Sequence, residues 1–410
     1  MHRSSYVHIE WRLRADACGG AETLWPLLSA SQATPHRDLV KIALAGLLAL
    51  HGLIHLIGPA KAFGWANVTQ LRQPISPTGG MLWLLAAVLL IGAAIAVAIG
   101  TQWWWCFALP GVLLSQFLIA QMWSDTKFGT FANVVIVVPV LLAALEARPS
   151  SFRSRFRHDS TTLLARPNHP APVVTETDIA ALPPLMQRYL RNVGAIGRPH
   201  VSNMRVEFDA QMRSSSTAPW MTSTATQYEF FNPPARLFHM NASRSGIPFD
   251  IYHRYVDGAA TFQVKIAGLY PMLDKAGIAM TKTETVTLMN DILVMAPAAA
   301  LDLPFTWETL SEHTVRATFS NTGFTVAATL TFNDAGDLVG FVSTDRWLPD
   351  GTTAKDVPWS TPISAYATVN GIRIGTRGDA NWIAPSGEWT YGKLRFASLR
   401  TTSRNDQQNP

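Results

Sequence analysis

Two histidines inside an apolar stretch are the first candidates for chemistry in this sequence. His51 and His55 are four residues apart, so a helix would place both on one face. Gln116 is a further polar residue in an apolar segment. Polar and ionisable residues within membrane spans are functional candidates by default. This group could relay protons, serve a quinone-like molecule, bind haem or a metal, or only join neighbouring helices by hydrogen bonds.

A metal needs three or four ligands, and no Cys, Asp or Glu falls at a depth that matches the two histidines. We therefore favour the structural role for His51 and His55, and we expect neither a metal nor another cofactor.

Charged residues elsewhere in the chain suggest weaker sites. Glu284 and Asp291 are seven residues apart and share a helical face, as paired carboxylates would. Glu284 also suits a helix N-terminus, where its negative charge would interact favourably with the helix macrodipole. The neighbours Asp345 and Arg346 point to opposite faces of a strand, so we expect one of them to pair with a different charge across the sheet. His253 could act as a general base, although an ordinary surface position explains it equally well.

Several functional classes are disfavoured by the sequence. It contains no P-loop, G-x-G-x-x-G, G-x-S-x-G or C-x-x-C motif. Its net charge of +5 gathers into no basic patch with interleaved aromatic residues, so nucleic acid is a poor candidate partner. We expect a binding protein more than an enzyme.

The strongest signal is a long stretch that is nearly free of charge. Only four charged side chains occur between positions 42 and 145, namely Lys61, Arg72, Asp125 and Lys127. About 20 apolar residues cross a bilayer core of about 30 Å. Four such segments can be counted, the last of them short, at 39–57, 81–100, 103–123 and 131–145. The sequence therefore predicts a helical bundle with four transmembrane helices, which makes the lipid bilayer a partner.

The basic residues that flank these segments predict the orientation. Arg37 and Lys41 precede the first segment, and Arg148, Arg153, Arg155 and Arg157 follow the last. Because basic residues are enriched on the cytoplasmic side, we expect a multi-pass protein of the inner cell membrane with both termini in the cytoplasm.

After the apolar part, the pattern changes to that of a soluble β domain. Alternation with period two marks strands, for example from Met204 to Met212 and from Phe324 to Phe332. Turn signals such as Asp257-Gly258 and Asn370-Gly371 separate about ten strands, mostly joined as hairpins. Helical spacing appears at 182–193 and 284–299. We predict an α+β domain in which an antiparallel curved sheet forms a half-barrel with helices covering its concave side. If the helices leave the concavity unfilled, an apolar pocket remains.

The resulting domain plan has five parts. They are a polar, disordered lead (1–36), a transmembrane domain (37–147), a basic linker rich in Pro, Ser and Thr (148–174), the β half-barrel (175–402) and a disordered tail (403–410). Tryptophans are frequent in the β domain and either fill its core or line a pocket. Our candidates for ligand contact are Trp307, Trp347, Trp382 and Tyr255.

A set of spaced motifs in residues 175–402 resembles an uncharacterised bacterial family of unknown function. The soluble motifs include Leu182-Pro183-Pro184, Tyr255-Val256-Asp257-Gly258, Leu288-Met289-Asn290-Asp291, Asp345-Arg346-Trp347, Trp359-Ser360-Thr361-Pro362 and Asn370-Gly371-Ile372-Arg373. Some members are similar in the membrane part as well, through His51-Gly52-Leu53-Ile54-His55-Leu56. The resemblance implies no known activity. The strand pattern is also similar to the half-barrel of lipoprotein carriers, which is an analogy of fold alone.

These observations lead to one functional hypothesis and two alternatives. We expect the β domain to bind a hydrophobic or lipid-like ligand close to the membrane. In the first alternative, the protein is a membrane enzyme or redox component that acts on a quinone-like solute through His51 and His55. In the second, it is a scaffold whose exposed strand edge docks a protein partner of unknown identity.

Overall fold

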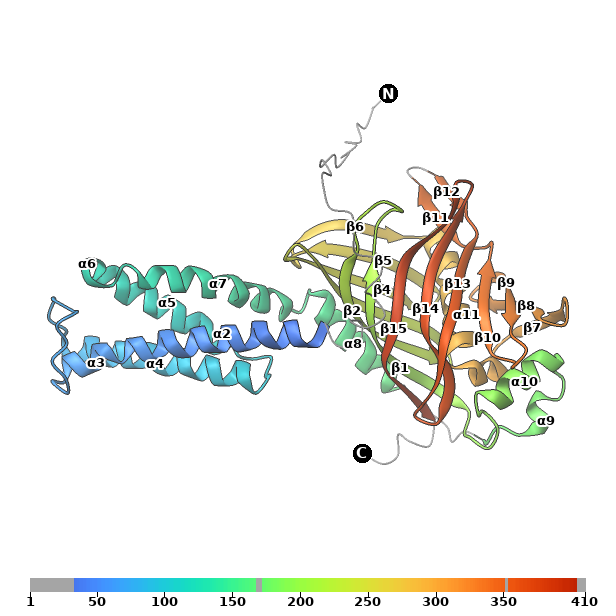
Figure 1. The fold of residues 1–410 in the computed structure, drawn as a ribbon, viewed down its shortest axis with the longest axis horizontal. Helices are drawn as coiled ribbons and strands as arrows, with labels where there is room; N and C mark the ends of the chain where they lie inside the picture. The colour runs from blue at the N-terminus through green and yellow to red at the C-terminus, as the bar shows by residue number, and fades with distance from the viewer. Residues whose placement is uncertain (1–32, 167–171, 351–352, 404–410) are drawn as a thin grey trace, which may run out of the picture. The chain divides into compact units, whose positions relative to one another are not determined.

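The computed structural model describes residues 33–166, 172–350 and 353–403 (Figure 1). The expected disordered lead, up to residue 32, and the expected tail after residue 403 lie outside the described residues. The chain forms two compact units, residues 1–136 and 137–410, which are described separately here.

The first unit contains apolar helices. They are α2 (Ala33–His55), α3 (Ile57–Ala62), α4 (Pro77–Ala98), α5 (Trp105–Gln121), α6 (Trp123–Thr126) and the first part of α7 (Gly129–Glu146). Three helical segments are long and apolar enough to cross a membrane: Leu39–Ala62, Pro77–Ala98 and Gly129–Glu146. Helices therefore occur at all four predicted positions, but α5 is shorter, with 17 residues.

The packing of these helices is the reverse of that in a soluble bundle. Large apolar side chains such as Leu85, Phe107 and Leu113 point outwards, at 46–61% exposure. Small residues lie where helices meet. A Cβ atom at Gly58 would come within 2.3 Å of the Trp83 side chain, so only glycine fits at this contact. Close contacts through small residues are typical of helices that pack within lipid.

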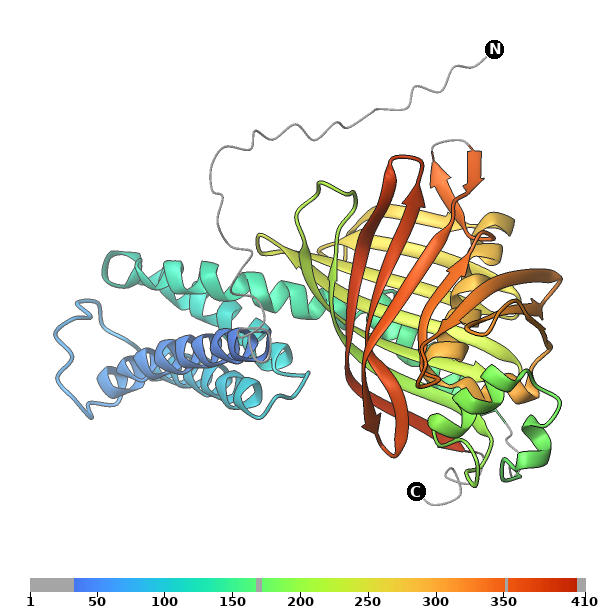
Figure 2. The same ribbon diagram turned by 45° about the vertical axis from the view of Figure 1, so that its right-hand side comes forward.

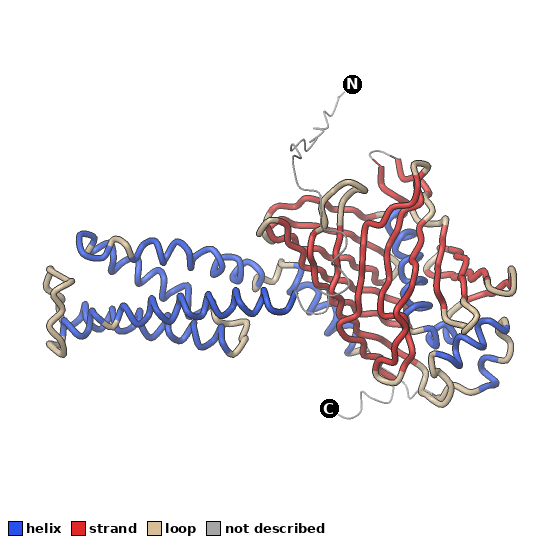
Figure 3. The backbone as a smooth tube through the Cα atoms, in the orientation of Figure 1, coloured by secondary structure: helices blue, strands red, loops and turns tan. Residues whose placement is uncertain are grey.

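The second unit is built on one antiparallel sheet of 13 strands, in the order β6-β5-β4-β3-β2-β1-β15-β14-β13-β10-β9-β8-β7 (Figures 1 and 3). The strands are β1 (Val201–Met212), β2 (Met221–Phe231), β3 (Pro234–Arg244), β4 (Ile247–Val256), β5 (Ala259–Ile266), β6 (Tyr270–Ala276), β7 (Phe305–Thr309), β8 (Thr314–Asn321), β9 (Phe324–Phe332), β10 (Leu338–Ser343), β13 (Trp359–Val369), β14 (Ile372–Ala384) and β15 (Gly387–Ser403). A separate hairpin contains β11 (Trp347–Asp350) and β12 (Thr353–Asp356). The antiparallel prediction is confirmed, although the sheet has more strands than the ten expected.

The predicted alternation and turns explain the sheet's local structure. Met204, Val206 and Phe208 are all buried, as the period-two pattern requires. Asp257 and Gly258 both have positive φ, at 53° and 74°, and join β4 to β5. A two-residue turn of this kind matches the right-handed twist of the two strands that it connects.

The sheet curls around α11 (Ile278–Met295), which packs against strands from both halves of the sheet (Figure 2). This helix was predicted at 284–299, but it begins at Ile278 and is followed by a 3-10 turn, η1 (Pro297–Asp302). Of its 18 residues, 14 are buried, so the helix occupies the concave side. The short α9 (Glu176–Ile179) and α10 (Pro184–Asn192) complete the core, and the buried Tyr189 hydroxyl donates to Leu293 O.

The segment predicted as a linker, 148–174, is in part a packed helix. Helix α8 (Phe152–Leu164) begins after Ser151, whose side chain accepts a hydrogen bond from Ser154 N. Its buried Phe152, Phe156 and Leu163 contact the outer face of β3 and β4. The basic side chains of this segment hid the apolar stripe at helical spacing in the sequence.

Candidate functional site

A cluster of buried charges joins the concave face of the sheet to α11. Arg236 on β3 lies between two carboxylates of the helix: its Nε donates to Asp291 Oδ2 at 2.8 Å and its Nη1 to Glu284 Oε2 at 3.0 Å. Glu229 on β2 lies 3.5 Å from Arg236 and is fully buried. Gln227 donates to both Glu229 and Asp291 at 2.9 Å. The cluster therefore ties three secondary structure elements together through charge-assisted hydrogen bonds.

The pKa values of the two glutamates in this cluster are shifted in opposite directions. Burial and the nearby charge of Asp291 raise the pKa of Glu229 well above its usual value. Glu229 Oε2 is buried and has no hydrogen-bond partner among the described residues. Burial also opposes the ionised form of Glu284, but the charges of His253 and Arg236 lower its pKa to about 2. Burial lowers the pKa of His253 itself, and Arg236 is the second cation that lowers the pKa of Glu284.

A second buried cation lies nearby, within a cage of aromatic rings. The guanidinium carbon of Arg346 lies 4.1 Å from the ring centre of Trp359 and 5.3 Å from that of Trp382. Its Nη1 donates to the hydroxyl of Tyr391 at 3.2 Å, while its Nε has no hydrogen-bond partner among the described residues. Its neighbour Asp345 faces the other way and lies 3.4 Å from Lys282 of α11. The expectation that Asp345 and Arg346 do not pair with each other is confirmed.

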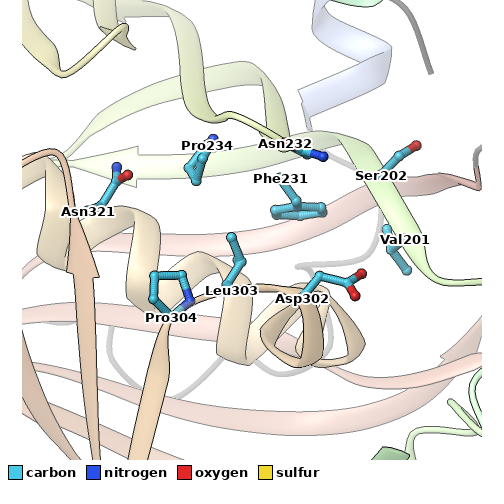
Figure 4. Close-up of a pocket in the computed structure, with 9 residues that line it drawn as sticks. All are labelled: Val201, Ser202, Phe231, Asn232, Pro234, Asp302, Leu303, Pro304 and Asn321. Carbon is cyan, nitrogen blue, oxygen red and sulfur yellow. The ribbon is translucent and has the colours of Figure 1, made fainter. Parts of the chain in front are cut away.

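An open pocket lies at the other end of α11, with a volume of about 280 Å³ (Figure 4). It is bounded by the start of β1, the turn between β2 and β3, the end of β8, and the segment from η1 to β7. Its lining residues are the apolar Val201, Phe231, Pro234, Leu303 and Pro304 and the polar Ser202, Asn232, Asp302 and Asn321. Asp302 accepts a hydrogen bond from the Nδ1 of His200 at 2.8 Å, which joins this lining residue to the end of the segment before β1.

The chemical capacity of these clusters differs. Among the described residues, no group of three or more His, Cys, Asp and Glu side chains is arranged to hold a metal ion. Glu229, with its raised pKa, and His253, with its lowered pKa, are the kinds of group that acid–base catalysis uses. Neither residue lines the pocket, however, and their hydrogen bonds run to other protein groups. The charged cluster therefore holds α11 in position on the sheet, whereas the pocket leaves space for a ligand.

The polar residues of the apolar helices meet around one asparagine. His51 Nε2 lies 2.9 Å from Asn133 Oδ1 and 3.1 Å from Ser115 Oγ. Asn133 Nδ2 donates to Gln116 Oε1 at 3.1 Å. His55 Nδ1 is bonded to the His51 carbonyl, while its Nε2 is buried without a partner in the described part of the chain. The structure therefore brings His51 and Gln116 together through Asn133.

A protein-family model for a family of unknown function, DUF6544, matches residues 172–394, more than half of the chain. The chain belongs to this family. The family expected from the spaced sequence motifs is thereby confirmed. No curated protein matches the sequence significantly.

Outside DUF6544, three solved structures share a loose likeness with the chain. A putative outer membrane lipoprotein-sorting protein domain from Vibrio parahaemolyticus is 10% identical, with a TM-score of 0.30 over 50% of this chain and 88% of the other. A DUF1329 family protein from Desulfovibrio piger is 10% identical, with a TM-score of 0.29 over 56% and 93%. A LolA superfamily protein from Nitrosomonas europaea is 8% identical, with a TM-score of 0.31 over 54% and 94%. Likenesses at this level support no argument about ligand or mechanism.

The four predicted ligand contacts of this DUF6544 domain do not meet in one site. Trp307 stacks on Phe305 at the β7 edge, and Trp347 lies beside Lys282. Trp382 belongs to the Arg346 cage, and none of the four lines the pocket. Only Tyr255 comes near it, since its hydroxyl accepts a hydrogen bond from Asn321 at 2.8 Å. These aromatic residues lie on distant strands, so their frequency did not indicate a common site.

Sequence reasoning missed the basic partner of the two helix carboxylates. Glu284 and Asp291 do share a face of α11, as predicted, and both accept hydrogen bonds from Arg236. A signal was available. Arg236 precedes Phe238 and Met240 at period two, which placed a charge on the buried face of a strand. A buried charge is tolerated only when it is paired, so the pattern called for an acidic partner across the core.

Proposed function

We propose that this protein is a membrane-anchored binding protein. The apolar helices would hold it in the inner cell membrane as a four-helix, multi-pass anchor with both termini in the cytoplasm. Three membrane-length helices and the outward apolar side chains of the first unit support this proposal. A cysteine introduced at Arg400 should react with a membrane-impermeant reagent only after the cells are opened. Labelling in intact cells would contradict the orientation.

The β domain would bind a hydrophobic or lipid-like molecule taken from that membrane. The observation that carries this proposal is the mixed lining of the pocket in Figure 4, which has five apolar and four polar residues. Apolar pockets with a few placed polar groups are the usual form of small-molecule sites. At about 30 Å³ for one water-sized group, 280 Å³ holds about nine such groups. The pocket therefore suits one end of an amphiphile, with Asp302 and the two asparagines near its polar part.

Photochemical crosslinking in lipid nanodiscs tests this proposal. The full-length protein is reconstituted with a phospholipid that carries a diazirine in one acyl chain, and the labelled peptides are mapped by mass spectrometry. We expect labels on the peptides that contain Phe231 and Leu303, in addition to labels on the apolar helices.

Two variants make the crosslinking result specific. Leu303→Trp would fill the pocket and should abolish labelling there while the labels on the helices remain. Leu310→Trp changes a residue of 40% exposure outside the pocket and should leave the pattern unchanged. Labelling confined to the apolar helices in the unmodified protein would refute the binding proposal.

A second candidate function rests on the unpartnered Nε2 of His55. A buried donor or acceptor without a partner is costly, and a quinone-like solute could supply the missing hydrogen bond. Spectra of reconstituted protein titrated with ubiquinone would detect such a complex. Its loss in both His51→Ala and His55→Ala, with the helices intact, would support a redox role. An unmodified protein that binds no quinone would exclude it.

A further inference from the structure

Four large apolar side chains are exposed together at one end of β4, β5 and β6. Ile247, Leu269, Tyr270 and Met272 are 51–67% exposed. Ile247 begins β4, and its neighbour Pro248 accepts a hydrogen bond from Ala267 N in the turn that joins β5 to β6. Leu269 belongs to this turn, and Tyr270 and Met272 follow it on the last strand of the sheet. We call these four residues the apolar edge.

The turn of the apolar edge is bonded to the residue that follows α7. Arg148 Nη2 donates to Gly268 O at 3.3 Å, and Arg148 Nε donates to Leu145 O at 3.2 Å. One guanidinium therefore bridges the last turn of α7 and the turn between β5 and β6. A hydrogen bond also spans the connection after α7, because Ser151 Oγ donates to Glu146 O at 2.6 Å.

Contacts between α8 and β5 form a second tie. Lys265 Nζ lies 4.4 Å from the ring centre of Phe152, and Arg155 Nη1 donates to Gln263 Oε1 at 2.8 Å. Phe152 is buried against Tyr252, with ring centres 6.1 Å apart. This end of the sheet is therefore tied to the segment that follows α7 in two places, through Arg148 and through α8.

The length of α7 sets the depth of this end of the sheet. Its 18 residues rise by about 1.5 Å each, or about 27 Å, close to the thickness of a hydrocarbon core. A residue two positions beyond Glu146 then lies among the lipid headgroups. Tyrosine with aliphatic neighbours suits that layer, and the basic Arg148, Arg155 and Lys265 suit anionic headgroups.

We propose that the apolar edge inserts into the headgroup layer of the bilayer that α7 crosses, so that the β domain lies on the membrane surface. This inference rests on the membrane anchoring proposed above. The bilayer is the occupant, because Arg148 bonds the turn of the apolar edge to the end of a membrane-length helix, and basic side chains lie beside that turn. The docking would keep the β domain beside its source of lipid.

Fluorescence in nanodiscs of phosphatidylethanolamine and phosphatidylglycerol tests the proposal. In a background that carries Cys18→Ser and Cys106→Ser, single cysteines are introduced in full-length protein and labelled with nitrobenzoxadiazole. Tyr270→Cys reports on the apolar edge. Leu310→Cys is the control, because Leu310 is 40% exposed and follows β7, at the opposite edge of the sheet. Val138→Cys, on an exposed position of α7, reports on anchoring.

The expected result is a blue-shifted emission at position 270 that doxyl-labelled lipids quench, together with quenching at 138 and none at 310. Quenching at 138 but not at 270 would overturn the docking while leaving the anchor in place. A blue shift at 270 without quenching by lipid would indicate a second copy of the chain on the edge, which also contradicts the proposal. An absence of quenching at 138 would show that the anchoring itself is wrong.

Discussion

Removal of the buried cation Arg236 is the sharpest test of the energetics of this fold. In Arg236→Met, Glu284 and Asp291 lose a partner at 3.0 and 2.8 Å in a site where the arginine side chain is only 8% exposed. Removing one partner of a buried ion pair costs about 3–5 kcal/mol, because the other charge is left without compensation. Since 1 kcal/mol lowers Tm by about 2–4 °C in a domain of this size, we expect a fall of about 6–20 °C.

Thermal unfolding of the full-length protein in detergent, followed by tryptophan fluorescence, measures this change. The matched control is Arg316→Met, which breaks an exposed pair with Glu308 at 2.9 Å. Exposed pairs contribute about 0–1 kcal/mol, so the control should shift Tm by about 4 °C at most. A fall in Arg236→Met no larger than that of the control would refute the assignment of Arg236 as the cation that holds α11.

The pH dependence of the same variant provides a second check. In the native protein, the pKa of Glu284 is about 2, below its unfolded value of 4.5. This carboxyl therefore contributes stability that is present above pH 4.5 and is lost as the pH falls towards 2. Without Arg236, the folded pKa rises and this contribution shrinks. The difference in Tm between the two proteins should thus narrow on acidification, and a constant difference would contradict the argument.

Three further predictions concern single hydrogen-bonding groups. Glu229→Gln should gain stability relative to the unmodified protein as the pH rises above 4.5, because the raised pKa of Glu229 means that stability is lost from that unfolded value upwards, and an amide cannot ionise. Denaturant titrations at several pH values measure this, and a difference between the two proteins that stays constant with pH would contradict it. Asn133→Leu should destabilise the helices by about 0.6–2 kcal/mol, since it removes the residue that joins His51 to two other polar groups, as unfolding in dodecyl sulfate would show. Tyr189→Phe should cost about 1–3 kcal/mol in thermal unfolding, because Leu293 O loses its buried donor; a neutral effect would mean that another donor replaces the hydroxyl.

The sequence determined those features that depend on neighbours along the chain. The scarcity of charge between Lys41 and Glu146 predicted the apolar helices, because backbone without contact to water is stable in lipid only when it is hydrogen-bonded internally. The alternation from Met204 to Ala210 predicted a buried face, since successive residues of a strand point to opposite sides. Turn pairs such as Asp257-Gly258 predicted hairpins through their tolerance of positive φ.

The tertiary structure alone decided which charges and surfaces meet. Arg236 and Asp291 are 55 residues apart, and the turn at Gly268 meets Arg148 over 120 residues. Pairings over such distances follow from how far the sheet curls and which helix it encloses. Helix α11 occupies the concave side of the sheet and leaves little of it empty. Its apolar and charged side chains contact the strands that surround it. Local propensity contains no information about that closure, which depends on the packing of the whole domain.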